Sequence, residues 1–214
     1  MSMAPPGTIQ IDAYFDLICP WCWIGKAHLT TASRLLTERM PEVHVQVIWH
    51  SVQLIPQVPP QGWPYQAFYE HRLGGPDTVR VRRAQVRDAA NLAGLTIHHE
   101  RIAMFPNTWR AHRLLALVAR QSASAHASLL DTLFESYFVH GLNLGDDQVL
   151  VPRAQAQGID ITQLEDQDAP AIWHLPEGAS GVPLFVFNQQ QALSGAQPPE
   201  ALLSAMLQSL RANV

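Results

Sequence analysis

The chain has very little of three things: cysteine, net charge and long apolar runs. Only two cysteines occur in 214 residues, which excludes a fold stapled by several disulfides. Charged residues make up 15% of the chain and the formal net charge is -4, so there is no electrostatic basis for binding nucleic acid or an acidic membrane surface. No apolar run approaches the length that spans a bilayer. We expect neither a nucleic-acid partner nor a membrane partner.

The N-terminal stretch MSMAPPGTIQIDAYF lacks the positive region and the long apolar region of a secretory signal, so we expect a cytoplasmic protein. The length and the 47% of hydrophobic residues suit one large domain, or one domain that carries an inserted subdomain. Four arginines share the stretch VRVRRAQVRD, residues 79–88. We interpret them as the solvated face of an amphipathic helix rather than as a binding patch.

The two ends of the chain show an α/β pattern. TIQIDAYF (8–15) predicts a strand, a helix with Pro20 at its start follows, and VHVQVIWH (43–50) predicts a second strand, parallel to the first. Near the other end PLFVFN and QALSG predict two strands joined by NQQQ, and PPEALLSAMLQSLRA predicts a helix. Between them, from about residue 64 to about residue 158, one amphipathic helix follows another. We place an α/β domain at 1–62 and 178–214 and an inserted helical subdomain at 63–177.

Cys19 and Cys22, in DLICPWCWIGK (16–26), stand where the first strand meets the first helix, at the strand end where open α/β sheets form ligand sites. A zinc site needs four ligands, and the adjacent His98 and His99 point in different directions, so we expect no metal site. A structural disulfide with this spacing would close a very small loop and would remove little entropy from the unfolded chain.

A redox pair has a positive mechanism. At a helix start Cys19 lies beside unsatisfied N–H groups and the positive end of the helix dipole, which favour the thiolate over the thiol. Cys22, almost one turn later, is placed to attack a mixed disulfide formed at Cys19. Pro20 suits the helix start, whereas Trp21 carries no charge that could stabilise a thiolate. We interpret Asp16 as an acceptor that fixes the turn into the helix, in preference to a proton shuttle.

The stretch GASGVPLFVFN (178–188) places Val182 and Pro183 directly before a strand. Most X-Pro bonds in folded proteins are trans. A redox site needs a rigid platform opposite its nucleophile, however, and a cis-proline turn would hold the Val182 backbone where an extended peptide pairs with it. We therefore predict a cis bond at Pro183.

These residues together resemble the thioredoxin superfamily, specifically the cytoplasmic DsbA-like oxidoreductases of the FrnE type. Besides DLICPWCWIGK, the resemblance is carried by PNTWRAHRLL (106–115), LFESYFVHGLNLGDDQVL (133–150) and GVPLFVFNQQQALSGAQPPEALL (181–203). It implies an α/β thioredoxin-like fold interrupted by an inserted all-helical subdomain. It also implies thiol–disulfide exchange with Cys19 as nucleophile and Cys22 as resolving thiol, beside a cis Pro183. The expected substrate-binding residues are Pro20, Trp21, Val182, Pro183 and Asn107.

The same branch includes the 2-hydroxychromene-2-carboxylate isomerases and the kappa-class glutathione transferases, which are similar in the FPNTWRAHR stretch, typically carry serine in place of Cys19 and use glutathione. The resemblance to these isomerases implies that Asn107 lines a cleft between the helical insert and the core. Its simpler role is to N-cap the following helix. The alternative function is thus a glutathione-dependent isomerase or transferase of a small aromatic substrate, and a redox-sensing binding module is a third.

We expect no bound cofactor, with glutathione as an alternative co-substrate. The expected partners are protein or small-molecule thiols and disulfides, and the apolar helix faces would also allow a homodimer. One departure from the family is segment 159–180, which is shorter and more broken by proline than the helical connection expected there. It predicts an approach to the cysteines that is more open, or that is shaped by Trp173 and His174.

Overall fold

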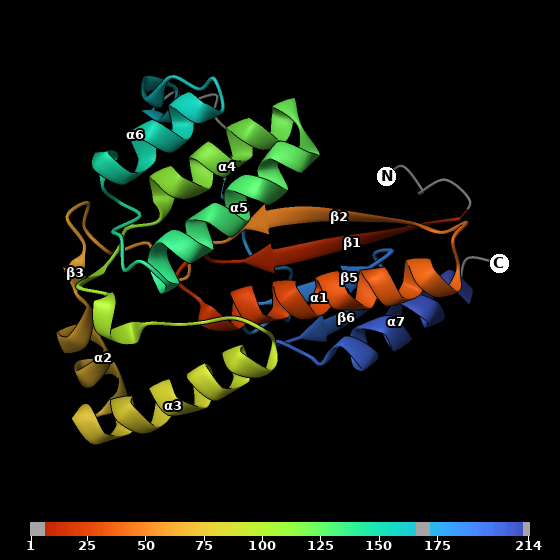
Figure 1. Cartoon of the computed structure of the whole chain (residues 1–214), viewed down its shortest axis with the longest axis horizontal. Coiled ribbons are helices and arrows are strands. Elements are labelled where there is room, and N and C mark those ends of the chain that lie inside the picture. Colours follow the sequence, from red (N-terminus) through yellow and green to blue (C-terminus); the bar gives the residue numbers. More distant parts are fainter. Residues whose placement is uncertain (1–6, 166–171, 212–214) are drawn as a thin grey trace. The chain divides into compact units, whose positions relative to one another are not determined.

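A computed structural model of the chain describes residues 7–165 and 172–211 (Figure 1). It consists of two compact units, one of residues 1–52 and 174–214 and the other of residues 53–173. The proline-rich segment after the second strand, which we assigned to the α/β domain, belongs to the second unit. Its physical link to that unit includes Gln53, whose Nε2 donates to Asn107 Oδ1 at 3.1 Å.

The first unit is built on a four-stranded sheet with the order β2-β1-β5-β6. Its strands are β1 (Thr8–Phe15), β2 (His44–Ser51), β5 (Leu184–Phe187) and β6 (Gln191–Ser194). β1 and β2 are parallel, β5 is antiparallel to β1, and β5 and β6 form a hairpin. The parallel pair and the hairpin confirm the predictions made from the sequence. In the hairpin connection Asn188 and Gln189 have φ angles of 48° and 59°, a left-handed conformation in which asparagine is enriched.

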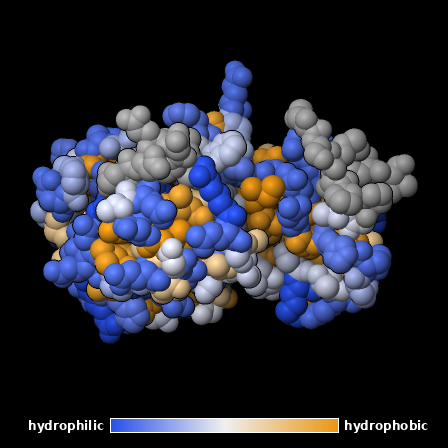
Figure 2. All heavy atoms as spheres, turned by 90° about the horizontal axis from the view of Figure 1, so that it is seen from above, coloured by the Kyte–Doolittle hydropathy of each residue, from blue (hydrophilic) through white to orange (hydrophobic). Residues whose placement is uncertain are grey.

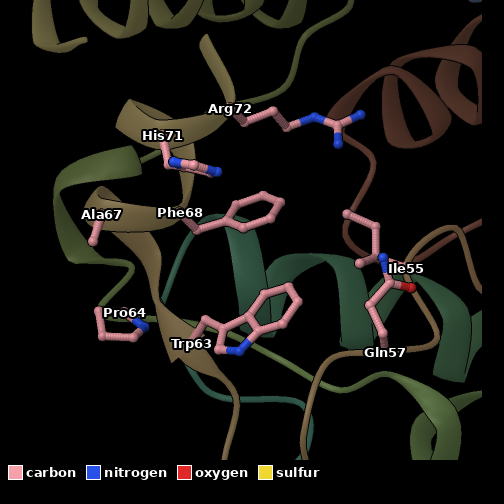
Figure 3. A pocket seen from close by; sticks show the side chains of 8 residues that line it. All are labelled: Ile55, Gln57, Trp63, Pro64, Ala67, Phe68, His71 and Arg72. Atoms are coloured by element: carbon pink, nitrogen blue, oxygen red, sulfur yellow. The ribbon is translucent and has the colours of Figure 1, made fainter. Parts of the chain in front are cut away.

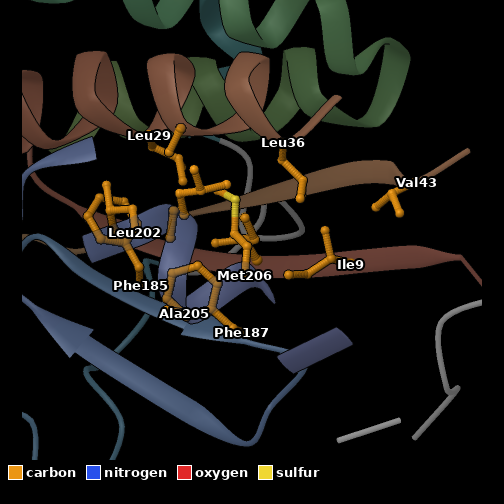
Figure 4. Close-up of a cluster of buried hydrophobic side chains, with 13 residues drawn as sticks. Ile9, Leu29, Leu36, Val43, Phe185, Phe187, Leu202, Ala205 and Met206 are labelled. Carbon is orange, nitrogen blue, oxygen red and sulfur yellow. The ribbon is translucent and has the colours of Figure 1, made fainter. Parts of the chain in front are cut away.

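Two helices, α1 (Pro20–Arg39) and α7 (Pro199–Arg211), pack against each other and against one face of this sheet (Figure 1). Every second residue of β1 is buried, because successive strand residues point to opposite faces. All of these buried residues except Phe15 meet both helices and β5 in one apolar cluster (Figure 4), which includes Ile9, Leu36, Phe185 and Met206. Each such side chain contributes roughly 1.5–3 kcal/mol on burial. The cluster holds α1, and the cysteines at its start, against the sheet.

The second unit is the predicted helical insert. Its helices are α2 (Tyr65–Leu73), α3 (Pro76–Leu92), α4 (Trp109–Gln121), α5 (Ala123–Phe138) and α6 (Asp147–Ala156), with short 3-10 helices at His99–Arg101 and Ile161–Glu165. α4 and α5 pack together, and Leu115, Leu130 and Phe134 are fully buried. The insert also contains an antiparallel ribbon of β3 (Trp63–Pro64) and β4 (Met104–Phe105), which is too short for its periodicity to be read from the sequence.

Within the two described ranges, no helix is long and apolar enough to cross a membrane. On the face drawn in Figure 2, apolar residues are interspersed with hydrophilic ones. Large apolar side chains that are exposed include Val81, Leu92 and Trp173.

Gly141, just after α5, allows a test of packing in the second unit. Its φ angle is 69°, and a Cβ added to it would lie 2.2 Å from the backbone oxygen of Arg101. Gly158 has a φ angle of 68°, but nothing lies within 4 Å of its added Cβ. We expect Gly141→Ala to lower the free energy of unfolding by about 3 kcal/mol or more, and Gly158→Ala by about 1 kcal/mol. Urea unfolding measures both, and equal losses would contradict the close approach at Gly141.

Candidate active site at the Cys19–Cys22 pair

Cys19 is the residue immediately before α1, with a φ of -92° and a ψ of 108°. Pro20 takes the first helical position, where its fixed φ suits the helix and its missing N–H costs nothing. The first turn of α1 contains no acidic side chain. The positive end of the helix dipole therefore acts on the Cys19 sulfur without a competing carboxylate in that turn.

Cys22 lies in the first turn of α1 and is more deeply buried than Cys19, with 1% of its surface exposed against 9%. Both are free thiols, and their side chains are within hydrogen-bond contact. Burial raises the pKa of the Cys22 thiol well above its ordinary value, and the hydrogen bond and the charge of Cys19 raise it further. Cys22 is therefore a thiol, not a thiolate, at neutral pH in the reduced protein.

Asp16 holds the turn between β1 and α1. It is completely buried, and its backbone oxygen accepts a hydrogen bond from Cys19 N at 3.1 Å. Its carboxylate oxygen Oδ1 lies 3.4 Å from Ile18 N, in the acceptor role that we expected. The carboxylate also acts on the second cysteine, because its charge raises the pKa of Cys22 while a backbone hydrogen bond from Asp16 lowers it.

The Val182–Pro183 peptide bond is cis, which confirms the prediction from G-V-P. The carbonyl oxygen of Val182 accepts a hydrogen bond from Cys19 Sγ at 3.7 Å. The carbonyl oxygen of Pro183 accepts one from Gly195 N at 2.8 Å, in the turn between β6 and α7. The structure thus brings the predicted pair Cys19 and Cys22 together with Val182 and Pro183, which lie about 160 residues later in the sequence.

Gly25 lets α1 approach Pro183 closely. A Cβ added to Gly25 would lie 3.0 Å from Pro183 Cγ and 3.2 Å from Phe185 Cζ, tighter than ordinary side-chain contacts. Phe185 is fully buried and the proline ring is stiff, so neither neighbour can move aside easily. Sequence reasoning missed this role. The available signal was its spacing of three residues from Cys22, which makes the two neighbours on the helix surface.

His28 ties α1 to the turn that holds Pro183. Its Nδ1 lies 2.9 Å from the backbone oxygen of Gln197, and since a carbonyl oxygen only accepts, Nδ1 is the donor. Gln197 N in turn donates to Gly195 O at 2.8 Å, and Gln197 Nε2 donates to Ser194 O at 2.8 Å. Sequence reasoning also missed His28, although it follows Gly25 by three residues on the same helix.

Trp21 and Lys26 complete the surroundings of the pair on α1. Trp21 is partly buried in the first turn. Lys26 Nζ lies 6.0 Å from the ring centroid of Trp49, at the limit of a cation–π contact. Trp49 in turn packs edge-on against Phe15, with 5.6 Å between centroids. The aromatic residues of β1 and β2 therefore support the helix that carries the cysteines.

Asn107 belongs to the second unit. Its Oδ1 accepts from Trp109 N at 2.9 Å and from Gln53 Nε2 at 3.1 Å, while its Nδ2 donates to Val58 O. The first of these bonds satisfies an N–H at the start of α4, although the N-cap residue is Thr108 and not Asn107, as N-capping by Asn107 would require. Its side-chain amide is thus engaged within the unit, and substrate binding by Asn107 stays a prediction.

Two further expectations from the sequence concerned segment 159–180 and a metal site. Residues 166–171, within segment 159–180, lie outside the described residues, and the exposed Trp173 and His174 follow them. In the part of the chain that the structure describes, no group of three or more His, Cys, Asp or Glu side chains could hold a metal ion. His99 Nδ1 instead lies 2.9 Å from the hydroxyl of Tyr65.

The fold and the paired cysteines at a helix start define a thioredoxin-like protein with a helical insertion. Residues 10–169 match the DSBA-like thioredoxin domain, so the chain belongs to that family. A crystal structure of a probable DsbA oxidoreductase from Streptomyces coelicolor has a TM-score of 0.79 and 26% identity, and the match covers 94% of this chain and 89% of that one.

Two further comparisons are more distant. The uncharacterized protein YwbO of Bacillus subtilis strain 168 is 24% identical over 192 residues, which cover 85% of this chain and 88% of that protein. The cytosolic disulfide reductase DsbM from Pseudomonas aeruginosa, with GSH, has a TM-score of 0.59 and 18% identity over 94% of this chain and 99% of that one. At that identity the likeness to DsbM concerns the fold.

The different burial of the two thiols predicts different reactivity. We expect iodoacetamide at about pH 7 to modify Cys19 in a Cys22→Ser variant well before it modifies Cys22 in a Cys19→Ser variant, because the raised pKa of Cys22 keeps its thiolate scarce. The rate at Cys22 should rise as the pH increases and the thiol ionises. Mass spectrometry of the alkylated protein measures both rates, and faster modification of Cys22 would contradict this assignment.

The bond from His28 to the Gln197 carbonyl predicts a difference between two substitutions. Asparagine can place its Nδ2 donor where Nδ1 of histidine lies, whereas aspartate would place an acceptor against the carbonyl oxygen. We expect His28→Asp to lower the free energy of unfolding by about 1 kcal/mol more than His28→Asn does. Urea unfolding of the two variants tests this, and equal free energies of unfolding would contradict the hydrogen bond from His28 to the Gln197 carbonyl.

Proposed function

We propose that this protein is a thiol–disulfide oxidoreductase that acts through its Cys-Pro-Trp-Cys pair. The observation that carries the proposal is the contrast between the two thiols. Cys19 is the more exposed of the two and lies at the positive end of a helix dipole, whereas Cys22 is buried and protonated beside it. A nucleophile and a reserve thiol in contact are what a two-step exchange needs.

In the first step the Cys19 thiolate attacks one sulfur of a substrate disulfide. The substrate S–S bond breaks, a mixed disulfide forms at Cys19, and one substrate thiolate leaves. In the second step Cys22 loses its proton to the substrate thiolate released in the first step and attacks Cys19 Sγ. The mixed disulfide breaks, the second substrate thiolate leaves, and the Cys19–Cys22 disulfide forms. The substrate gains two electrons, which the two cysteines lose, and the reverse sequence oxidises a dithiol.

The Val182–Pro183 segment is the proposed platform for the substrate. Val182 O lies 3.7 Å from Cys19 Sγ, so an extended chain next to the reacting disulfide would run along the Val182 backbone. Pro20 and Trp21 follow Cys19 directly and would flank the same substrate. Proteins or low-molecular-weight thiols and disulfides are the proposed partners, and the cytoplasm, where thiols are kept reduced, is the proposed compartment.

A second candidate function is a glutathione-dependent isomerase or transferase acting on a small aromatic molecule. Two shared folds favour it: that of a 2-hydroxychromene-2-carboxylate isomerase, with a TM-score of 0.59 and 18% identity, and that of DsbM, whose structure includes GSH. Saturable glutathione binding, together with turnover that survives Cys22→Ser, would support this candidate over dithiol exchange.

The proposed dithiol function predicts separate phenotypes for the two cysteines. We expect Cys19→Ser to lower the rate of insulin reduction in the presence of dithiothreitol by about 100-fold or more, because it removes the attacking sulfur. Cys22→Ser should instead accumulate a mixed disulfide between Cys19 and a protein substrate, visible by mass spectrometry. The same two variants should fail to oxidise a reduced model protein. Wild-type activity in Cys19→Ser would eliminate the proposal.

A further inference from the structure

A pocket of about 390 Å³ lies in the second unit, and every residue that lines it comes from that unit (Figure 3). This volume is in the range of small-ligand sites. The residues that matter for its chemistry are Ile55, Trp63, Ala67, Phe68, His71 and Arg72. None of them takes part in the thiol chemistry proposed above.

The apolar wall of the pocket is formed by β3 and one side of α2. The rings of Trp63 and Phe68 stack with 5.6 Å between their centroids and 19° between their planes. Phe68 also contacts Phe105, which is 1% exposed, at 4.1 Å between centroids, so the wall is anchored in the core of the unit. Ala67 adds a small, exposed side chain to the same wall. Trp63 and Phe68 are only half-buried, so part of each ring faces the pocket.

The last turn of α2 forms one end of the pocket. His71 and Arg72 occupy the last turn of α2 and are exposed, and Figure 3 places Arg72 at one end of the pocket, reaching toward the segment that carries Ile55. The carboxylate of the same turn, Glu70, accepts a hydrogen bond from Gln66 Nε2 at 2.6 Å. Arg72 therefore brings a positive charge to the pocket, whose lining residues include no carboxylate.

We propose that this pocket binds an aromatic side chain of a partner polypeptide that carries acidic residues beside it. The partner ring would stack against Trp63 and Phe68, and its carboxylate would pair with Arg72. The exposure of Ala67, His71 and Arg72 shows that the pocket is open to solvent. A free small molecule usually buries most of its surface in its site, whereas an aromatic anchor needs one open side through which its own chain leaves. The inference goes beyond the proposed redox function and requires no thiol.

The test is binding of a fluorescein-labelled, cysteine-free peptide, acetyl-Gly-Asp-Glu-Trp-Glu-Asp-Gly, to the wild-type protein, followed by fluorescence anisotropy. One matched peptide has serine in place of tryptophan, and another has amides in place of its carboxylates. Each should bind about ten-fold more weakly than the parent peptide. The serine peptide loses the ring that stacks on Trp63 and Phe68, and the amide peptide loses the carboxylate that pairs with Arg72. Added salt should weaken the parent peptide more than the amide peptide.

Two protein variants locate the binding. Ala67→Glu puts a carboxylate into the pocket without removing a core side chain, and Gln66→Glu puts the same charge on a neighbouring exposed position that does not line the pocket. We expect about ten-fold weaker binding for Ala67→Glu and about the wild-type affinity for Gln66→Glu. Arg72→Gln should weaken the acidic peptide but not the amide peptide.

Several results would overturn the inference. The first is the absence of binding of the parent peptide up to about 1 mM, which is already weak for a specific contact. The second is an equal affinity of the Ala67→Glu and Gln66→Glu proteins for that peptide. Competition by free indole-3-acetate at an affinity equal to that of the peptide would instead identify a small-molecule pocket. Because the peptides contain no cysteine, these outcomes are independent of whether the Cys19→Ser variant retains redox activity.

Discussion

The antiparallel pairing of β1 with β5 is the interaction on which the candidate site depends. Its register sets Tyr14 opposite Leu184, so the segment that leaves β1 toward Cys19 lies beside the segment that enters β5 from Pro183. The apolar cluster of β1, β5, α1 and α7 stabilises this pairing from one face of the sheet. Cys19 Sγ and Val182 O, 163 residues apart, are within 3.7 Å for that reason.

The two cysteines differ in environment although they share one helical turn. Cys19 precedes the helix, at the positive end of its dipole, and Cys22 points into the unit, where loss of solvent disfavours a negative charge. The start of one helix therefore places a more exposed sulfur beside a buried one. Gly25 and His28 extend the same arrangement along α1: the first allows close contact with Pro183, and the second bonds the turn behind it.

Much of this could be predicted from local patterns. The β-forming residues of 8–15, the alternation in 43–50 and the helix between them were enough to predict the parallel pair, and NQQQ between two apolar runs predicted the hairpin. Contacts that depend on a partner element could not be predicted in the same way. Gly25 reads as an ordinary helical glycine until Pro183 is placed against it, and the two-residue strands of the ribbon are too short to carry a period. The segment after β2 joins the second unit through side-chain bonds that no sequence pattern reveals.

The sequence by itself determined the chemistry that is available: two thiols three residues apart at a strand-to-helix junction, and a proline before a late strand. These features are local, because the spacing of residues and the start of a helix are set within a few positions of the chain. Only the tertiary structure decided that the proline faces the thiols, that Cys22 is the buried member of the pair, and that Trp63, Phe68 and Arg72 surround one pocket. Burial and long-range contact arise when distant segments pack together, and no local pattern contains them.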